Sequence, residues 1–265
     1  MENQLQVISS VEALDVINRS ELDVTIVTSK KFPRDLEKSR SDILKYATAS
    51  RETAENCFYS IPRAGKTIEG PSVRLAEIIN YCWGNINSGV RVIGNDGQKI
   101  TAQAVAFDTE RNNRITQEVS RNIVGKDGKT FTQDMQIVTG NAAGSIAWRN
   151  AIFRLIPNAV WIDIQDKIKK FIVGDGKEMI KRRDSLLGKF NELGVKTEDV
   201  LKRLNLADVG SITPEIMIKL FGLLTAINEG SSSVEDAFGV AAPKSNTPDM
   251  EDDSPANKSG ELPLK

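Results

Sequence analysis

A change in hydrophobic period along residues 89–124 constrains the fold of this chain more than any other feature. Small or apolar side chains alternate with other residues on both sides of the sequence Asn95-Asp96-Gly97, and alternation returns over residues 115–123. Alternation is typical of strands with two different faces, and an Asn-Asp-Gly sequence is typical of a tight hairpin turn. A second turn is expected at residues 108–113. We therefore predict a three-stranded antiparallel meander.

The segment after the meander returns to the period of a helix. Trp148, Ala151, Ile152 and Leu155 follow the i, i+3, i+4, i+7 spacing of one helical face, which predicts a long helix over residues 133–155. Helical patterns also flank this core on both sides. We therefore expect an α+β fold, in which a β-β-β-α core carries flanking helices, a small C-terminal helical module and a disordered tail.

Breaks in composition divide the chain into four expected segments. Residues 1–56 are predicted to form helical segments, and residues 57–183 hold the core, which ends in a basic helical stretch over residues 160–183. Residues 184–240 are predicted to form the small helical module. Residues 241–265 hold four of the nine prolines and an acidic cluster, and they contain too few large apolar groups to fold.

The sequence does not support an ATP site. Residues 61–67 are predicted to form a loop that ends in Gly65-Lys66-Thr67, which resembles the end of a phosphate-binding loop. Ser60 stands where that loop needs its first glycine, and Gly70-Pro71 interrupts the helix that should start at the lysine. We therefore expect no bound nucleotide.

Composition excludes several classes of enzyme. The chain has 265 residues and no histidine, which excludes an imidazole base, a serine or cysteine triad and a His-ligated metal within one chain. Cys57 and Cys82 are too few for a disulfide framework, fit a reducing compartment and are expected to be buried.

No run approaches the roughly 20 apolar residues that span a bilayer, and the polar start Met1–Ser10 does not resemble a signal peptide. We therefore expect a cytoplasmic protein.

A metal-dependent nuclease is one alternative that needs no histidine. Carboxylates could hold magnesium and a lysine could position water in the sequences Asp127-Gly128-Lys129 and Asp175-Gly176-Lys177. Both sequences are predicted to be glycine turns, and neither has an acidic partner upstream. We therefore expect no metal and no covalent catalysis.

Basic side chains concentrate in the middle of the chain. Residues 91–183 hold 16 basic and 10 acidic residues, whereas residues 184–240 hold 5 and 9. This pattern fits either an ordinary solvated surface or a phosphate-binding centre with an acidic appendage. If the long helix packs across the sheet, its edge and the strand ends form a groove that suits phosphate oxygens. The candidate DNA-binding residues are Arg91, Lys99, Arg114, Arg121, Arg149 and Arg154 in this groove, with Arg63, Lys66 and Arg74 as further candidates outside it.

Aromatic residues lie close to these cations in the sequence. Phe107, Phe131, Trp148 and Phe153 could stack on nucleic-acid bases. Trp148 also belongs to the apolar stripe of the long helix, and this position favours a place in the core. The two interpretations of Trp148 make different predictions about its exposure.

Four features follow one another between residues 40 and 240. They are the loop and helix of residues 68–77, the meander, the sequence Ala147-Trp148-Arg149-Asn150-Ala151-Ile152, and the terminal helices from Gly222 to Phe238. In this order they resemble the phage-type single-strand annealing recombinases, the group that contains RecT, lambda Red beta and Erf. Members of this group share a β-β-β-α core.

The resemblance implies an ATP-independent protein that coats single-stranded DNA as an oligomeric ring or helical filament and promotes strand pairing. It implies that DNA lies in a positive groove between sheet and helices, and that no cofactor is needed. The helical module and acidic tail would then contact a phage exonuclease or the host single-strand-binding protein. A different class is also open: a non-enzymatic phage adaptor or inhibitor that binds a host protein through the same module and tail.

Overall fold

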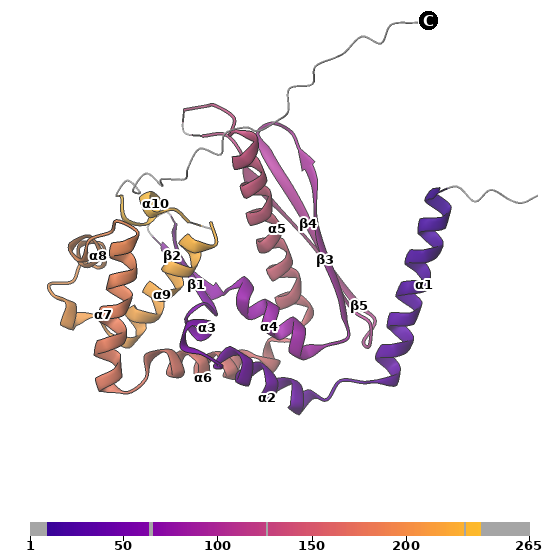
Figure 1. The fold of residues 1–265 in the computed structure, drawn as a ribbon, viewed down its shortest axis with the longest axis horizontal. Helices are drawn as coiled ribbons and strands as arrows, with labels where there is room; N and C mark the ends of the chain where they lie inside the picture. Colours follow the sequence, from indigo (N-terminus) through magenta and orange to yellow (C-terminus); the bar gives the residue numbers. More distant parts are fainter. Residues whose placement is uncertain (1–9, 64–65, 126, 231, 240–265) are drawn as a thin grey trace, which may run out of the picture.

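The computed structural model describes residues 10–63, 66–125, 127–230 and 232–239, and Figure 1 shows their arrangement. The helices are α1 (Ser10–Lys31), α2 (Leu36–Ala47), α3 (Arg51–Glu55), α4 (Val73–Trp83), α5 (Gln133–Leu155), α6 (Ile162–Val173), α7 (Gly176–Glu192), α8 (Thr197–Leu204), α9 (Pro214–Asn228) and α10 (Val234–Phe238). The strands are β1 (Phe58–Arg63), β2 (Lys66–Pro71), β3 (Ile86–Asn95), β4 (Lys99–Asp108) and β5 (Asn113–Asn122). Short 3-10 turns lie at Asn158–Val160 and Val209–Ser211. The predicted tail, residues 241–265, lies outside the described residues.

The predicted α+β meander and long helix are confirmed. β3, β4 and β5 form an antiparallel sheet in that order, with Ala104 opposite Val90 on one side and Gln117 on the other. Along β4 every second side chain from Ile100 to Asp108 is buried, and the residues between them are partly exposed. α5 covers the buried side, so the sheet has one packed face and one open face (Figure 1).

Small residues bring α5 close to the sheet. Three buried alanines of β4 face the helix, which presents Gly140 and Gly144 to the strands. A Cβ atom added at Gly140 would lie 2.9 Å from Cδ1 of Ile100, and one at Gly144 would lie 3.2 Å from Cγ2 of Val90. Larger side chains at these positions would therefore push the helix off the sheet.

The prediction of a loop over residues 61–67 is wrong for residues 61–63 and 66–67, which belong to the antiparallel hairpin of β1 and β2. β1 packs directly on α9. A Cβ atom added at Gly222 would lie 2.8 Å from the carbonyl carbon of Tyr59 and 2.9 Å from the nitrogen of Ser60. The contact that supports the hairpin thus comes from far along the chain, where a local pattern cannot report it.

The basic stretch over residues 160–183, expected to be one helical segment, is two helices instead. α6 ends at Gly174, whose φ of 68° lies in the left-handed region, and Asp175 caps α7 by accepting a hydrogen bond from the N–H of Glu178. Arg182 is only 6% exposed. It donates hydrogen bonds to carbonyl oxygens at the end of α6 and forms an ion pair with Glu178. This cation therefore holds the corner between the two helices.

The C-terminal helices share a core with the rest of the fold. α7 crosses the expected boundary between residues 183 and 184, and α9 packs on β1, α6 and α7. Buried side chains of these helices and of α2, α4 and α5 form one continuous cluster. Thr213 and Ser233 cap α9 and α10, as their sequences predict. Among the described residues, no helix combines the length and the apolar character needed to cross a bilayer.

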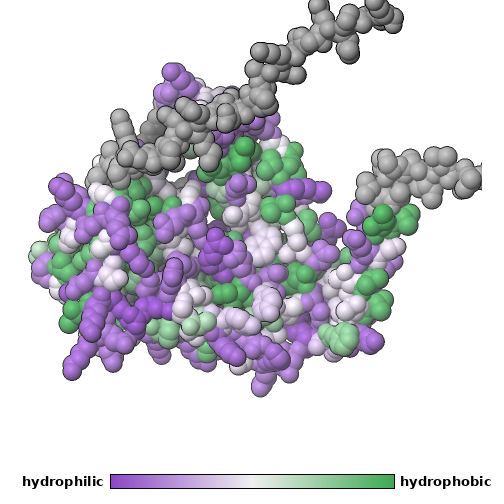
Figure 2. All heavy atoms as spheres, viewed as in Figure 1, coloured by the Kyte–Doolittle hydropathy of each residue, from purple (hydrophilic) through white to green (hydrophobic). Residues whose placement is uncertain are grey.

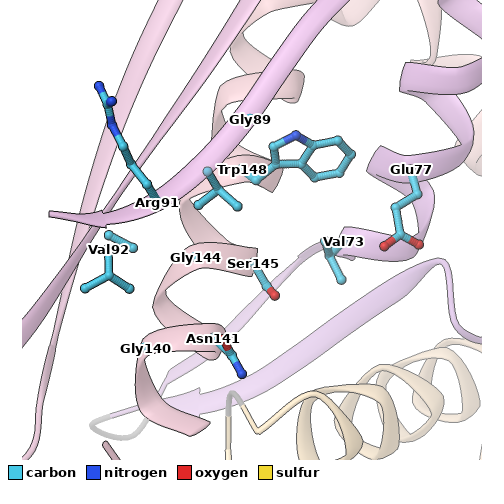
Figure 3. Close-up of a pocket in the computed structure, with 12 residues that line it drawn as sticks. Val73, Glu77, Gly89, Arg91, Val92, Gly140, Asn141, Gly144, Ser145 and Trp148 are labelled. Carbon is cyan, nitrogen blue, oxygen red and sulfur yellow. The ribbon is translucent and has the colours of Figure 1, made fainter. Parts of the chain in front are cut away.

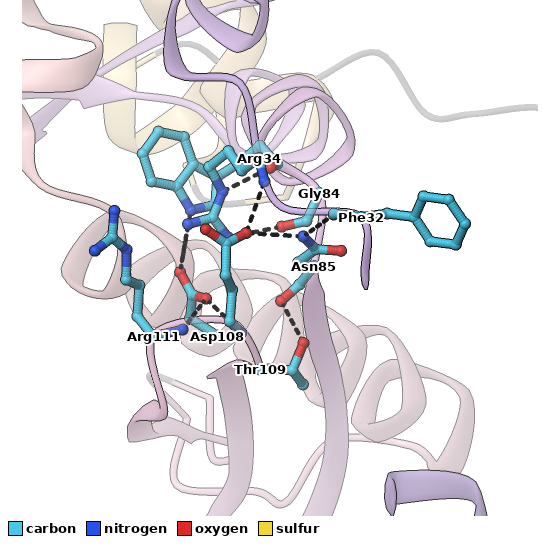
Figure 4. A network of polar contacts seen from close by, with 9 residues as sticks. Phe32, Arg34, Gly84, Asn85, Asp108, Thr109 and Arg111 are labelled. Carbon is cyan, nitrogen blue, oxygen red and sulfur yellow. Dashed lines mark hydrogen bonds and ion pairs between the residues drawn. The ribbon is translucent and has the colours of Figure 1, made fainter. Parts of the chain in front are cut away.

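A polar network ties the segment after α1 to the end of the sheet (Figure 4). Arg34 stacks on Trp83, with 4.2 Å between its guanidinium carbon and the ring centroid, and forms a 3.0 Å ion pair with Asp108. Asn85 Nδ2 donates a hydrogen bond to the carbonyl oxygen of Phe32. Burial alone would raise the pKa of Asp108, but Arg34 and backbone donors hold that pKa below its usual value. The network therefore fixes the point at which α1 leaves the fold.

We expect Gly222→Ala to destabilise the protein by about 1–3 kcal/mol, because the new methyl group would meet the backbone of β1. Gly188→Ala in α7 is the matched control, since a Cβ atom there meets nothing within 4 Å. It should raise the free energy of unfolding by about 0.5–1 kcal/mol, as alanine does in helix interiors. Urea denaturation of both variants checks this. Equal stability of the two variants would show that α9 does not press on β1.

Candidate nucleic-acid interface

The open face of the sheet carries a hollow that we call the sheet trough. It is lined by Asn87, Gly89 and Arg91 of β3, Val105 and Phe107 of β4, and Arg114 of β5. Two adjoining cavities of about 310 and 570 Å³ form it, and they share lining residues from all three strands. Gly89 has no side chain, and no atom lies within 4 Å of the position that its Cβ atom would take. The floor of the trough is therefore lower at this residue.

Strand register places two arginines at the trough. Arg91 pairs with Gln103 and Arg114 pairs with Phe107, and both partners belong to the side of β4 that faces away from α5. Arg91 Nη2 donates a 3.2 Å hydrogen bond to Oε1 of Gln103, and Gln103 Nε2 donates a 2.9 Å hydrogen bond to Oε1 of Glu118. This ladder orients Arg91 across the sheet, while its side chain stays exposed.

α1 forms the outer wall of the trough. Asn18, Glu21 and Leu22 line the larger cavity opposite the sheet residues. In Figure 1 the helix stands beside the sheet, on the side away from α5. The polar network around Arg34 holds the C-terminal end of this wall.

A second hollow, which we call the α5 pocket, lies on the other side of the β3 edge (Figure 3). Its cavity is about 560 Å³ and is lined by Glu77 of α4, Val90 and Arg91 of β3, and Asn141, Ser145 and Trp148 of α5. The indole of Trp148 lies between Arg91 and Glu77 in Figure 3, and its Nε1 donates a 3.2 Å hydrogen bond to Oγ of Ser88. Trp148 is therefore both packed against β3 and partly exposed in a cavity.

The predicted sheet cations lie on different surfaces. Arg91 and Arg114 line the trough, and Lys99 lies beyond it in a separate hollow beside the turn between β3 and β4. Arg121 pairs with Ile100, a residue of the buried side, so it belongs to the face that α5 covers. The structure therefore brings two of these four cations together.

Arg149 and Arg74 belong to a cluster between α4, α5, α9 and β1. The guanidinium carbon of Arg149 lies 4.4 Å from the ring centroid of Tyr59, and burial lowers the pKa of Arg149. Arg74 forms a 2.8 Å ion pair with Glu77, and its Nε lies 4.0 Å from Oε1 of Glu229. Burial raises the pKa of Glu229, although both arginines act against the rise. The cluster joins the C-terminal helices to the core.

The other candidate cations lie elsewhere. Arg154 is exposed near the end of α5 and lines neither the trough nor the α5 pocket. Arg63 pairs with Lys66 at the end of the β1–β2 hairpin, where the backbone alone is described. Arg154 thus does not join Arg91 and Arg114 at the described trough.

The residues considered for catalysis have structural roles. Asp127 accepts a hydrogen bond from the N–H of Lys129 within a turn, and Asp175 caps α7. Within the described ranges, no three acidic or cysteine side chains gather as a metal site requires. Burial raises the pKa of Cys57 to about 12 and that of Cys82 to about 11, so both thiols stay protonated at neutral pH.

The sequence analysis named Phe107 of the trough and Trp148 of the α5 pocket, but it missed the other uncharged residues that line the two hollows. Gly89 could have been found from the alternation of β3, because it shares its face with Arg91 and leaves a gap there. Asn141, Ser145 and Trp148 have i, i+4, i+7 spacing, which is one stripe of a helix, and Trp148 also belongs to the apolar stripe of α5. The i, i+4 spacing of the polar residues Asn141 and Ser145 was the sequence signal that could have revealed this side of the α5 pocket.

Comparison with known proteins found no match to a family model, to a curated protein or to a solved structure. The sheet trough and the α5 pocket are therefore the features from which we infer a function.

We expect Glu229→Gln to stabilise the protein at neutral pH. The folded pKa lies above the ordinary value of 4.5 because the carboxyl is buried, so folding favours the protonated form. The stability that this group contributes is therefore present below pH 4.5 and is lost as pH rises through the folded pKa. Glutamine is neutral throughout, so the variant should have a higher Tm at neutral pH and a flatter dependence of unfolding free energy on pH above 4.5.

Glu215→Gln is the control of opposite sign. Hydrogen bonds at the start of α9, from its own N–H and from Thr213, lower the pKa of Glu215. Its charged form is therefore favoured on folding, and the glutamine variant should lose stability at neutral pH. A fall in Tm for Glu229→Gln would contradict the buried position of that carboxyl.

Proposed function

We propose that this protein binds single-stranded DNA in the sheet trough and promotes the pairing of complementary strands without ATP, as an oligomer in a bacterial cytoplasm. One observation carries the proposal: Arg91 and Arg114 flank a hollow on a three-stranded sheet, and the described lining of the smaller cavity between them contains no carboxylate. Guanidinium groups bind phosphate oxygens with two parallel hydrogen bonds. Exposed cations at fixed positions suit a chain of phosphates.

Phosphate binding in the trough suits annealing in particular. Phosphate contacts position a strand and carry no sequence information, so base edges stay free to test a complement. Neutral side chains of the open face, Thr101 and Ser120, already hydrogen bond to each other and do not compete for base edges. A strand held by its backbone can therefore present its bases outward.

The core order supports the same activity. The β-β-β-α order of this fold is the order shared by the phage-type single-strand annealing recombinases, which the sequence resembles. On this proposal the helices α8–α10 and the acidic segment Asp249–Asp253 serve as a module for a protein partner, for example a phage exonuclease or the host single-strand-binding protein. Their acidic balance makes them a poor site for DNA.

Exposed apolar side chains support an oligomer. Val16, Ile17, Val24 and Val27 fall within one arc of α1, on the side opposite to its trough-lining residues, and are 51–66% exposed. Figure 2 shows apolar surface along α1 and a second apolar area over the start of α5. Met135, Ile137 and Val138 supply exposed apolar side chains there. Two different apolar surfaces on one chain fit head-to-tail assembly into a ring or filament.

Pairing of two labelled complementary oligonucleotides, without nucleotide triphosphate and at two salt concentrations, tests the proposal. The protein should accelerate pairing, more strongly at low salt, and leave both strands intact. Arg91→Ala or Arg114→Ala should weaken single-strand binding about ten- to hundredfold, because each removes a charge-assisted contact worth roughly 1.5–3 kcal/mol. Each should also lower the salt slope by about 0.7.

Arg154→Ala is the matched control, because Arg154 is an exposed arginine that lines neither hollow. It should change single-strand affinity less than about twofold, as a distant surface charge does. Loss of binding in Arg154→Ala with full binding in Arg91→Ala would move the site to α5. Absence of both binding and acceleration in the unchanged protein would reject the proposed function.

We expect Val24→Asp with Val27→Asp to break assembly while leaving the subunit folded. Both side chains are exposed on α1, so the charges disturb no buried contact within the chain. Analytical ultracentrifugation should show smaller species, and the circular dichroism spectrum should not change. Thr28→Asp, another exposed position of the same helix outside the apolar arc, is the control. Unchanged assembly in the double variant would exclude α1 from the subunit contact.

A further inference from the structure

The α5 pocket is not explained by phosphate binding. Only one of its described lining residues, Arg91, is a cation, and Val90, Trp148 and neighbouring small residues form much of its wall. A cavity of about 560 Å³ with an apolar wall and a few polar groups has the size and character of a site for a small organic group. The ligand class must therefore be one that uses both an aromatic surface and hydrogen bonds.

The side chains on α5 favour a planar, polar heterocycle. Trp148 offers a partly exposed indole, on which any nucleobase can stack. Asn141 lies two turns before it on the same helical face, and its amide both donates and accepts hydrogen bonds. Ser145, between them, offers a hydroxyl that does the same. Groups that both donate and accept tolerate the edges of different bases, so the pocket suits binding without sequence preference.

Arg91 connects this pocket to the sheet trough. It lies on β3, which is the edge of the sheet, and it lines both the pocket and the smaller trough cavity. The guanidinium of Arg91 points across the open face to Gln103, so a phosphate that it holds would stand in the trough, beside the β3 edge that borders the pocket. One base of the same strand can turn over the β3 edge while the backbone stays on the open face.

We propose that the α5 pocket receives one nucleobase of a bound single strand, with Trp148 as its stacking surface and Asn141 and Ser145 as its hydrogen-bonding groups. The proposal rests on the proposed function, because the strand in the trough delivers the base. One base held by each subunit anchors the strand against sliding. The neighbouring bases stay free to pair.

Tryptophan fluorescence gives a direct test. Of the three tryptophans, Trp83 and Trp161 are 8% and 9% exposed, so Trp148 is the indole that a ligand can reach. The unchanged protein is titrated with a thymidine oligonucleotide and with an abasic oligonucleotide of the same length, and binding is followed in parallel by anisotropy of an end label. We expect the thymidine strand to quench emission and to bind about tenfold more tightly, as loss of one stacked base would predict. The abasic strand should bind without quenching.

Ser145→Leu is the blocking variant, because leucine suits an exposed helix position and fills the pocket without entering the core. It should bind both oligonucleotides with the weaker affinity. Ser185→Leu, at an exposed position of α7, is the control and should keep the tenfold preference. Trp148→Phe should abolish the quenching.

The outcomes separate the two proposals. Equal affinity for the two strands without quenching would overturn the base pocket and leave the proposed function standing. Quenching of Trp148 by free deoxyadenosine monophosphate, without binding of either oligonucleotide, would support the pocket and reject the strand in the trough. No binding and no quenching by any of the three probes would overturn both.

Discussion

The close contact of α5 with β4 is the constraint on which the rest of the structure depends. Glycines at positions 140 and 144 and the buried alanines of β4 let a helix backbone lie low on the sheet. Small side chains bury little apolar area, so this layer is fixed by shape more than by hydrophobic gain. Large, fully buried side chains occur elsewhere in the fold, for example Ile43 of α2, Leu75 of α4 and Phe190 of α7. The sheet is consequently covered on one face only, and its other face is available for a ligand.

The position of α1 follows from the same sheet. Asp108 ends β4 on the buried side, and the ion pair with Arg34 joins this strand end to the segment after α1. The buried ion pair between Arg34 and Asp108 lies outside the trough, but it orients α1, which forms the outer wall of the trough. Breaking a buried pair leaves an uncompensated charge, which costs more than the loss of an exposed contact. Arg34 accordingly has a structural role, although its charge alone would suggest a contact to phosphate.

Local periodicity predicted the parts of this fold whose partners are close in sequence. The meander and α5 are confirmed because alternation and helical spacing record which face of an element is buried. The same rule separates Arg114 from Arg121: the two residues are seven positions apart on one strand, and an odd separation places their side chains on opposite sides of β5. Arg149 could not be placed in this way. Its stacking partner Tyr59 belongs to a hairpin that only tertiary packing on α9 reveals.

An edge strand explains why one cation can serve two hollows. Within the described chain β3 pairs with β4 alone, so its outer side has no neighbouring strand to separate the two faces of the sheet. A residue there can border the hollows on both faces, which a residue on β4 cannot do, and the guanidinium of Arg91 itself points across the open face to Gln103. Arg91 has this position and lines both hollows, whereas Arg114 lines the trough and not the α5 pocket. Loss of the Arg91 side chain therefore removes a cation from the trough and changes the rim of the α5 pocket, whereas loss of Arg114 leaves that pocket intact.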